Sequence, residues 1–450
     1  MHRNPSRTGR RIILISAMAI ITVFGQGFFL SALAQSAGAI VGQLSAERAA
    51  KTLAIEDPAG VKPMDAFYAS LARTALKQPG AITRVAHYGA SIIEMDLISG
   101  PMRRLLQKKW GDSGHGFVHV SRPQPWYKPF DLIHKPSASW IAFALYEKSA
   151  DRRFGYGGTV SLAFKPNAKS KIGTLKRGHL GTKVSRFEIL FPMEPAGGLL
   201  ELKMDGKKLG AVNTVSSSPE DAWAQIRVPD GRHLLELNAK TKNIRAYGVI
   251  LERDEPGVVY DSLGVNGIGI AAYQNVDKNC WIGQLRHRNP NLVILGFGTN
   301  EARFNTDSMQ FKQNILGVIS TVRRALPGVS ILLLGPVDTA TKKGFKLVSQ
   351  PLLPKIVAGQ REAAAQAKVA YWCMFEAMGG PGTAAKWYAA KPRLTAGDLI
   401  HPTPKGGEVL AGLFYNALMQ GFAEYLEENG LPKGPPPTGP ADPLRKVEIQ

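Results

Sequence analysis

Strand and helix patterns alternate in two stretches of the chain, residues 63–125 and 256–428, and a block of short strand patterns separates them. Apolar runs such as Leu292–Gly296 and Ser330–Leu334 are typical of strands that are buried on both faces. Alternating strands and helices indicate a parallel sheet that is covered by helices on both sides. Residues 126–255 instead carry short period-two segments between Gly, Pro, Asn and Asp, which favours a β-sandwich. We therefore expect one α/β domain that is interrupted by an inserted, jelly-roll-like β-sandwich.

Local patterns place individual elements within these stretches. A helix is expected over 64–77, a strand over 82–87 and a helix over 94–110, so that a strand-to-helix turn contains Ser91. The last helix is expected over 406–426. Because residues 431–450 are rich in Pro and Gly, we expect them to form a disordered tail.

The N-terminus has the layout of a secretory signal. Four arginines within the first eleven residues precede an apolar run that ends in Ala32-Leu33-Ala34, a motif typical of a cleavage site. The run is also long enough to cross a membrane, so an uncleaved anchor is the alternative. Residues 1–34 are therefore predicted to be a signal peptide or membrane anchor and residues 35–62 a linker. Either interpretation places the rest of the chain in the periplasm or outside a bacterial cell.

The excess of basic residues bears on the partners of the protein. Its 56 Lys and Arg against 35 Asp and Glu give a formal net charge of +21, which favours anionic partners such as nucleic acid, a membrane surface or an envelope polymer. No basic helix, zinc-finger spacing or RNA-binding aromatic motif accompanies the charge. We therefore expect no nucleic-acid partner and interpret the charge as an adaptation to the cell envelope.

The two cysteines, Cys280 and Cys373, have no CxxC or Cys/His spacing, so no structural metal site is expected. In an oxidising compartment they could form a disulfide. Two buried thiols are an equally good interpretation of the sequence.

Polar residues with catalytic chemistry follow the strand patterns. Ser91 comes after the first strand in a turn that Gly89 permits, and the helix expected after it would direct backbone N–H groups toward an oxyanion. Asp398 and His401 lie three residues apart before the last helix, so the carboxylate can orient one imidazole nitrogen while the other accepts a proton from a serine. Such groups converge at the carboxyl ends of a parallel sheet.

Two further turns offer hydrogen-bond donors. Gly298-Thr299-Asn300 follows a buried strand and can present the Asn300 amide, and Gly267 follows another strand and can present its backbone N–H. Each motif alone also has an ordinary structural interpretation: a helix N-cap for Ser91, an Asx turn for Asn300 and a helix-capping loop for residues 398–401. The functional prediction depends on the four segments together.

Taken in this order, the four segments resemble the SGNH hydrolase family, which carries a Gly-Asp-Ser block, an oxyanion glycine, a Gly-x-Asn block and an Asp-x-x-His block. The resemblance covers residues 63–125 and 256–428 and implies a three-layer, flavodoxin-like fold. It implies a serine esterase that needs neither metal nor cofactor. The site residues that it implies are Ser91 as nucleophile, His401 as base, Asp398 as its orienting acid, and an oxyanion hole formed by the backbone N–H groups of Ser91 and Gly267 with the Asn300 side chain.

The chain departs from the family pattern at Ala90, where the family has Asp, and this leaves room for a weakened enzyme or an inactive relative. A literal Gly111-Asp112-Ser113 follows a helix rather than a strand, so we interpret Ser113 as a structural residue. The histidines His87, His115 and His119 could line the cleft, and structural roles are the alternative.

The long β-rich insert resembles that of bacterial peptidoglycan O-acetylesterases and O-acetyltransferases. The resemblance therefore implies an exported esterase that removes O-acetyl or similar acyl groups from an envelope glycan. A glycan O-acetyltransferase would use the same residues, and a non-catalytic glycan-binding scaffold is the alternative from another class of protein.

Overall fold

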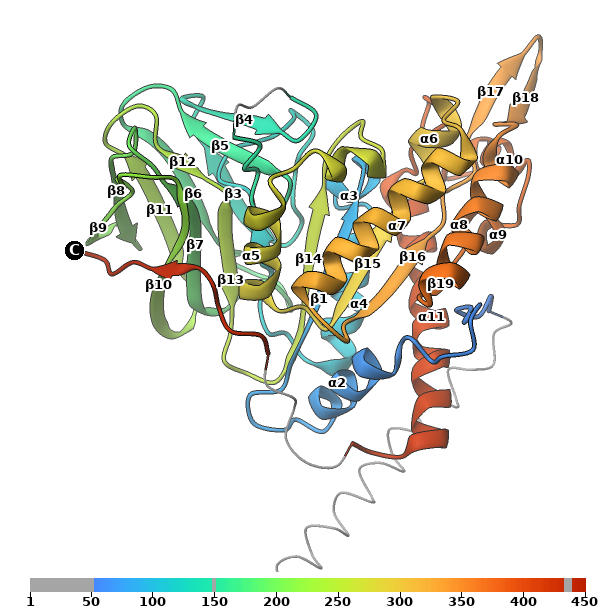
Figure 1. Cartoon of the computed structure of the whole chain (residues 1–450), viewed down its shortest axis with the longest axis horizontal. Coiled ribbons are helices and arrows are strands. Elements are labelled where there is room, and N and C mark those ends of the chain that lie inside the picture. Colours follow the sequence, from blue (N-terminus) through green and yellow to red (C-terminus); the bar gives the residue numbers. More distant parts are fainter. Residues whose placement is uncertain (1–51, 148–150, 433–438) are drawn as a thin grey trace, which may run out of the picture.

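Two structural parts lie side by side in the protein, one rich in β-strands and one of mixed α/β structure (Figure 1). The structure, a computed structural model, describes residues 52–147, 151–432 and 439–450. The predicted signal segment over 1–34 lies outside the described residues. Among the helices within these ranges, none is long and apolar enough to cross a membrane.

A five-stranded parallel sheet forms the centre of the α/β part. Its strands, in spatial order, are β14 (Gly257–Gly264), β1 (Ile82–Gly89), β15 (Leu292–Gly296), β16 (Ser330–Leu334) and β19 (Ala370–Trp372). Gly89 at the end of β1 lies opposite Gly264 on one side and Gly296 on the other. The loops that follow these three strands therefore meet at one edge of the sheet.

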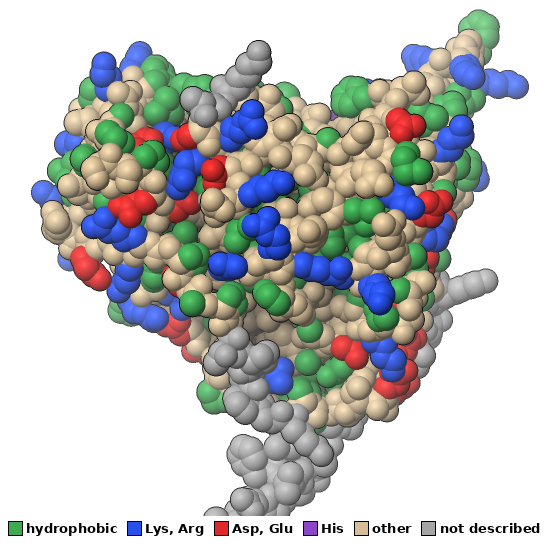
Figure 2. Space-filling view, in the orientation of Figure 1, with side chains coloured by type: hydrophobic (Ala, Val, Ile, Leu, Met, Phe, Trp, Pro, Cys, Tyr) green, Lys and Arg blue, Asp and Glu red, His purple; other side chains and the backbone are tan. Residues whose placement is uncertain are grey.

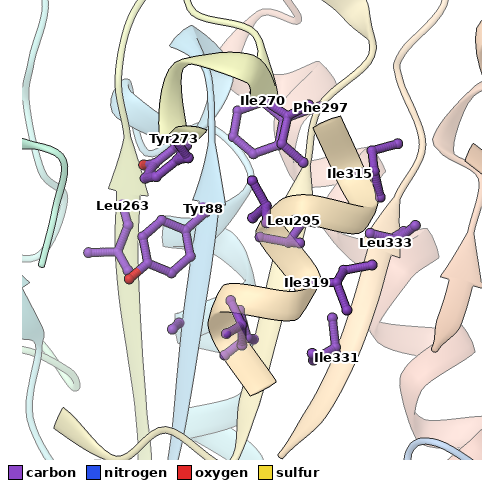
Figure 3. Close-up of a cluster of buried hydrophobic side chains, with 14 of the residues drawn as sticks. Tyr88, Leu263, Ile270, Tyr273, Leu295, Phe297, Ile315, Ile319, Ile331 and Leu333 are labelled. Carbon is purple, nitrogen blue, oxygen red and sulfur yellow. The ribbon is translucent and has the colours of Figure 1, made fainter. Parts of the chain in front are cut away.

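Helices cover both faces of this sheet and complete three layers. One face packs against α2 (Asp65–Ala75), α4 (Ser99–Trp110) and α11 (Pro404–Asn429), and the other packs against α5 (Lys278–Arg288), α7 (Ser308–Ala325) and α8 (Leu353–Ala367). Figure 3 shows the second layer, where Leu295 of β15 and Leu333 of β16 lie close to Ile315 of α7. Burial on both faces explains the unbroken apolar runs of these strands. The predicted three-layer fold is confirmed.

The β-rich part contains two sheets that share one apolar core and are antiparallel apart from the parallel pairing of the last strand, which confirms the predicted β-sandwich. The first sheet comprises β2 (Gly116–Val118), β13 (Gly248–Glu252), β7 (Val184–Met193), β10 (Glu220–Gly231) and β20 (Arg445–Lys446). The second comprises β3 (Leu132–Pro136), β6 (Ala168–Thr174), β11 (Leu234–Ala239), β8 (Leu199–Met204) and β9 (Lys207–Asn213). A smaller sheet comprises β12 (Arg245–Ala246), β5 (Thr159–Ala163) and β4 (Trp140–Ala144). Phe187 and Leu237 are among the side chains of the shared core.

Buried charges join the two parts. The Arg288 guanidinium of α5 donates from Nε to Asp261 of β14 at 2.7 Å and also pairs with Glu252 of β13. Arg84 of β1 contacts both oxygens of Glu252 at 2.8 Å. Because a charge that loses its buried partner is costly, this network holds the sandwich in one position against the parallel sheet.

The structure corrects three boundaries. The sandwich begins upstream of residue 126, since β2 pairs with β13. Residues 439–450 do not form a disordered tail: β20 pairs with β10, and Gln450 exchanges backbone hydrogen bonds with Ala211. Backbone pairing of this kind depends on an open strand edge rather than on the composition of the tail. The predicted loose linker is attached to the sheet within its described residues 52–62, where the backbone of Glu56 pairs with Tyr371 of β19.

The helix predicted over 94–110 is two helices. A single turn, α3 (Ser91–Glu94), ends before Asp96, whose φ of 57° is left-handed, and α4 begins at Ser99. Asp96 is held there by hydrogen bonds from the Ser99 hydroxyl at 2.7 Å and the Phe130 backbone N–H at 2.9 Å. Periodicity missed this break because the apolar spacing continues across it.

Candidate active site

Ser91 lies at the carboxyl edge of the sheet, in the turn between β1 and α3. The turn is tight at Gly89, where a Cβ atom would lie 2.5 Å from Cγ1 of Ile93 and 3.0 Å from the Gly296 carbonyl oxygen. Only glycine fits this close approach. As the first residue of a helix, Ser91 has a backbone N–H without a partner inside the helix. The Ser91 N–H at the start of this short helix is therefore available to an oxyanion, whereas the sequence predicted a longer helix at this point.

His401 and Asp398 reach Ser91 from the loop before α11. His401 Nε2 lies 2.7 Å from the Ser91 hydroxyl oxygen, and His401 Nδ1 lies 2.6 Å from Oδ2 of Asp398. With the proton assigned to Nδ1, where it is donated to the carboxylate, Nε2 is left to accept from the serine. The structure thus brings together the three residues predicted from the sequence in one nucleophile–base–acid chain.

The Asp398 carboxylate is fixed by its own loop. Its Oδ1 accepts from the backbone N–H groups of Ile400 at 2.9 Å and His401 at 3.0 Å. Burial would raise the pKa of Asp398, but the hydrogen bonds from the His401 side chain and from these N–H groups outweigh it and hold the pKa below its usual value. Asp398 is therefore ionised at neutral pH and can stabilise a protonated His401.

The loop keeps its shape through Leu399, a non-glycine residue with a φ of 63°. The Leu399 side chain is buried against Ala340 and Ala384, and its carbonyl accepts from the Ala340 N–H at 2.9 Å. These contacts hold a sparsely populated backbone conformation between the acid and the base.

Asn300 occupies the wall opposite the histidine loop, in α6 (Thr299–Arg303). Its Nδ2 donates to the carbonyl of Ile268 at 2.8 Å, and the amide has a second N–H to offer. Ile268 and Asn300 line the same pocket as Ser91. Gly267 precedes Ile268 with a φ of 74°, but Gly267 itself is not one of the residues that line the pocket. Its backbone conformation, rather than lack of space, favours glycine there.

Glu301 is a residue that the sequence analysis missed. Its buried carboxyl group accepts from the backbone N–H of Ile270 and from that of Gly298, both at 2.8 Å. One side chain thus connects the loop of Gly267 with the turn of Asn300. Its place directly after Asn300 was the signal in the sequence, since a charged residue that follows a buried strand needs partners.

A small pocket opens beside Ser91, on the side of β15 and β16. Apolar side chains form most of its wall, among them Ile92, Ile268, Leu334 and Met374, and Ala90 also lines it. The pocket contains about 500 Å³ of empty space including its open mouth. A short acyl group fits such a site, and a charged group in it would be poorly solvated.

The literal Gly-Asp-Ser does not contribute to this site. Ser113 is fully buried, and its hydroxyl donates to the carbonyl of Glu255. His87, His115 and His119 are also buried, and burial lowers the pKa of His87 and of His119 to about 3. Neutral, enclosed imidazoles of this kind have structural roles. Cys280 and Cys373 are both buried and unpaired thiols, so they do not form a disulfide with each other.

Part of the chain matches a known protein family. Residues 235–409 match the GDSL-like lipase/acylhydrolase family, a range that contains Gly267, Asn300, Asp398 and His401. Ser91 lies outside this range. No curated protein matches the chain by sequence.

Solved structures share the fold. A peptidoglycan O-acetylesterase superposes with a TM-score of 0.69 at 21% identity, over 82% of this chain and 99% of the other. A salicylyl-acyltransferase from a tetracycline biosynthetic pathway matches 70% of this chain and 99% of its own at 16% identity, with a TM-score of 0.29. A family two carbohydrate esterase from Clostridium thermocellum matches 61% of this chain and 96% of its own at 13% identity, with a TM-score of 0.24. The last two likenesses are weak, and no argument depends on them.

The GDSL-like match and the shared fold support a carboxylic ester hydrolase of the SGNH type. Within that class the chain resembles the peptidoglycan O-acetylesterases, as its sequence predicted.

Proposed function

We propose that this acylhydrolase is an exported esterase that removes O-acetyl or similar acyl groups from a cell-envelope glycan such as peptidoglycan. The observation that carries the proposal is the continuous chain of hydrogen bonds from the Ser91 hydroxyl through His401 to Asp398. An arrangement with these distances is suited to generate an alkoxide-like nucleophile at neutral pH.

In the first half of the proposed reaction, His401 Nε2 takes the Ser91 hydroxyl proton while Oγ attacks the ester carbonyl carbon. The resulting oxyanion accepts hydrogen bonds from the Ser91 and Gly267 backbone N–H groups and from Asn300 Nδ2. When the tetrahedral intermediate collapses, the bond to the sugar oxygen breaks. His401 gives its proton to that oxygen, and the acyl group stays on Ser91.

In the second half, His401 takes a proton from a water molecule, which attacks the acyl-enzyme carbonyl. Collapse releases the carboxylic acid, and His401 returns the proton to Ser91. Every proton is carried by His401, so the proposed steps call for no metal or cofactor. A sugar hydroxyl in place of water would make the same site an acyltransferase.

The proposal of a glycan substrate draws on the β-sandwich beside the site and on the shared fold with a peptidoglycan O-acetylesterase. The proposal of export draws on the signal-like residues 1–34, and an uncleaved segment would hold the enzyme at the membrane. Figure 2 shows Lys and Arg side chains spread over both parts of the visible face. A diffuse positive surface of this kind favours an anionic envelope partner over a nucleic acid, for which no recognition motif is present.

The test is acetate release from O-acetylated peptidoglycan by the purified protein, with p-nitrophenyl acetate as a simple ester. We expect both substrates to be hydrolysed, and Ser91→Ala to abolish both activities. Turnover of p-nitrophenyl acetate without acetate release from the glycan would refute the substrate class. Transfer of the acyl group to an added oligosaccharide, in place of its release, would identify a transferase.

A further inference from the structure

Two large aromatic side chains are exposed beside the catalytic turn. Trp126 is 47% exposed and Tyr146 is 49% exposed, although side chains of this size bury a large apolar area when they are packed. Both belong to the insert: Trp126 precedes β3 and Tyr146 follows β4. Exposed aromatic side chains next to an active site are typical of a surface that binds a ligand.

Glu94 connects Trp126 to the catalytic turn. The Trp126 indole N–H donates to Oε2 of Glu94 at 3.3 Å. Glu94 lies three residues after Ser91 in the same helical turn, and side chains at that spacing are neighbours on one side of a helix. The aromatic ring therefore lies within one side-chain length of the turn that carries the nucleophile.

Tyr146 shares this location with Trp126. Gln124, two residues before Trp126, donates from Nε2 to the Tyr146 hydroxyl at 3.0 Å. Burial, in the first place, raises the pKa of Tyr146, and the negative charges of Glu147 and Glu94 raise it further, whereas the Gln124 hydrogen bond lowers it. Gln124 thus connects Tyr146 to the segment that carries Trp126.

The Glu94 carboxyl group is itself held in place. It is 3% exposed, and burial raises its pKa, whereas the Trp126 indole and the backbone of Asn266, the residue before Gly267, lower it. Gly264 allows β14 to lie close to the backbone of α3, because a Cβ atom there would lie 2.0 Å from the backbone nitrogen of Glu94. Glu94 thus links the Trp126 indole to the turn of Ser91, close to the end of β14.

The two sides of Ser91 differ in character. The small apolar pocket extends toward β15 and β16, whereas Glu94, Asn266 and the aromatic pair lie on the side of β14 and the insert. An ester bound at Ser91 has two halves, the acyl group and the alcohol. If the acyl group occupies the pocket, the alcohol half extends toward the aromatic pair.

We propose that Trp126 and Tyr146 form a subsite for the sugar ring that bears the ester. A pyranose ring presents an apolar face of C–H groups with hydroxyls at its rim, which matches a flat aromatic face with polar groups such as Gln124 beside it. The inference depends on the proposed glycan substrate and deepens it, because it gives the insert a role in substrate recognition.

The experiment compares an O-acetylated peptidoglycan fragment with ethyl acetate, which has no sugar and no aromatic group. Trp126→Ala and Tyr146→Ala are each expected to raise KM for the glycan fragment about tenfold. Their kcat/KM for ethyl acetate is expected to stay within about twofold of wild type, because ethyl acetate has no sugar ring to contact the two aromatic side chains. Phe164→Ala, which removes an exposed ring from the same insert, is the matched control and should leave the kinetic constants for both substrates unchanged.

Trp126→Phe separates the ring from the indole N–H. A sugar subsite predicts that the phenylalanine variant keeps most of the glycan KM. An equal loss of kcat/KM for both substrates in Trp126→Ala would instead mean that Trp126 acts on Ser91 through Glu94. This result would overturn the proposed subsite. An unchanged KM for the glycan fragment in both alanine variants would overturn the subsite as well. A wild-type enzyme that cleaves ethyl acetate but not the glycan fragment would refute the proposed function instead. If Trp126→Ala does not fold, Tyr146→Ala carries the test.

Discussion

The hydroxyl oxygen of Ser91 and Nε2 of His401 lie 2.7 Å apart, although 310 positions separate the two residues in the chain. The contact forms with Ala90 at the position before the nucleophile, so the carboxylate that the sequence pattern lacks is not needed to bring the two residues together. The contact also decides between the two candidate serines, because Ser113 is buried at the carbonyl of Glu255.

Substitution of the two serines should therefore have opposite effects. Ser91→Ala removes the nucleophile and is expected to lower kcat for p-nitrophenyl acetate by at least about 1,000-fold with little change in stability. Ser113→Ala removes a buried hydrogen bond and is expected to cost about 1 kcal/mol of stability while kcat per folded molecule is unchanged. Steady-state kinetics with denaturant unfolding separates these results. Loss of activity in a folded Ser113→Ala protein would reverse the assignment.

Asn300→Ala tests the oxyanion donor. Because the Asn300 amide is proposed to bond the oxyanion more strongly than the ground-state carbonyl, its loss is expected to lower kcat by about 100-fold with KM nearly unchanged. The variant also loses the 2.8 Å bond to the Ile268 carbonyl, so its thermal stability is the necessary control. A rise in KM at constant kcat would show that Asn300 binds substrate and does not stabilise the transition state.

Ala90→Asp restores the residue of the family pattern, and we expect it to lower activity. Ala90 lines the mostly apolar pocket beside Ser91, so an added carboxylate would oppose the negative charge that develops on the substrate oxygen. A decrease of about tenfold in kcat is expected, with Ala90→Asn as the uncharged control of similar size. A large increase in kcat in Ala90→Asp would instead show that alanine at this position weakens catalysis in the natural protein.

Glu94 gives the protein a specific dependence of stability on pH. Burial is the main cause that raises the pKa of Glu94 from 4.5 to about 7, against the hydrogen bonds from Trp126 and Asn266. Between these values the folded state binds more protons at this site than the unfolded state does. The contribution of Glu94 is therefore fully present below pH 4.5 and is lost as the pH rises toward 7 and above, by at most about 3 kcal/mol.

Glu94→Gln removes this titration and keeps the shape of the side chain. We expect the stability of the variant relative to wild type to increase between pH 5 and pH 8, measured by urea unfolding at both values. Glu408→Gln, which changes a half-exposed surface carboxylate, is the control. If the free energy of unfolding changed equally for wild type and Glu94→Gln between pH 5 and pH 8, this result would contradict the raised pKa of Glu94.

Much of the fold and part of the site could be predicted because their signals are local. The apolar runs of β15 and β16, and the amphipathic pattern of α7, reflect burial that repeats with a fixed period. Asp398 and His401 were recognisable because a contact three residues apart depends on one turn of the chain. The alternation of strand and helix patterns predicted the parallel sheet, and the order of the four motifs gave the resemblance that implied the site residues.

The tertiary structure alone decided what depends on distant segments. The contact of Ser91 with His401, the link that Glu301 makes between two loops, and the contact of Trp126 with Glu94 each join residues whose separation carries no periodic signal. The same holds for the chain end, where pairing with β10 overrides a composition typical of disorder. The physical reason is that hydrogen bonds and buried charges select partners by geometry in the folded chain, whereas sequence patterns record only which residues are buried.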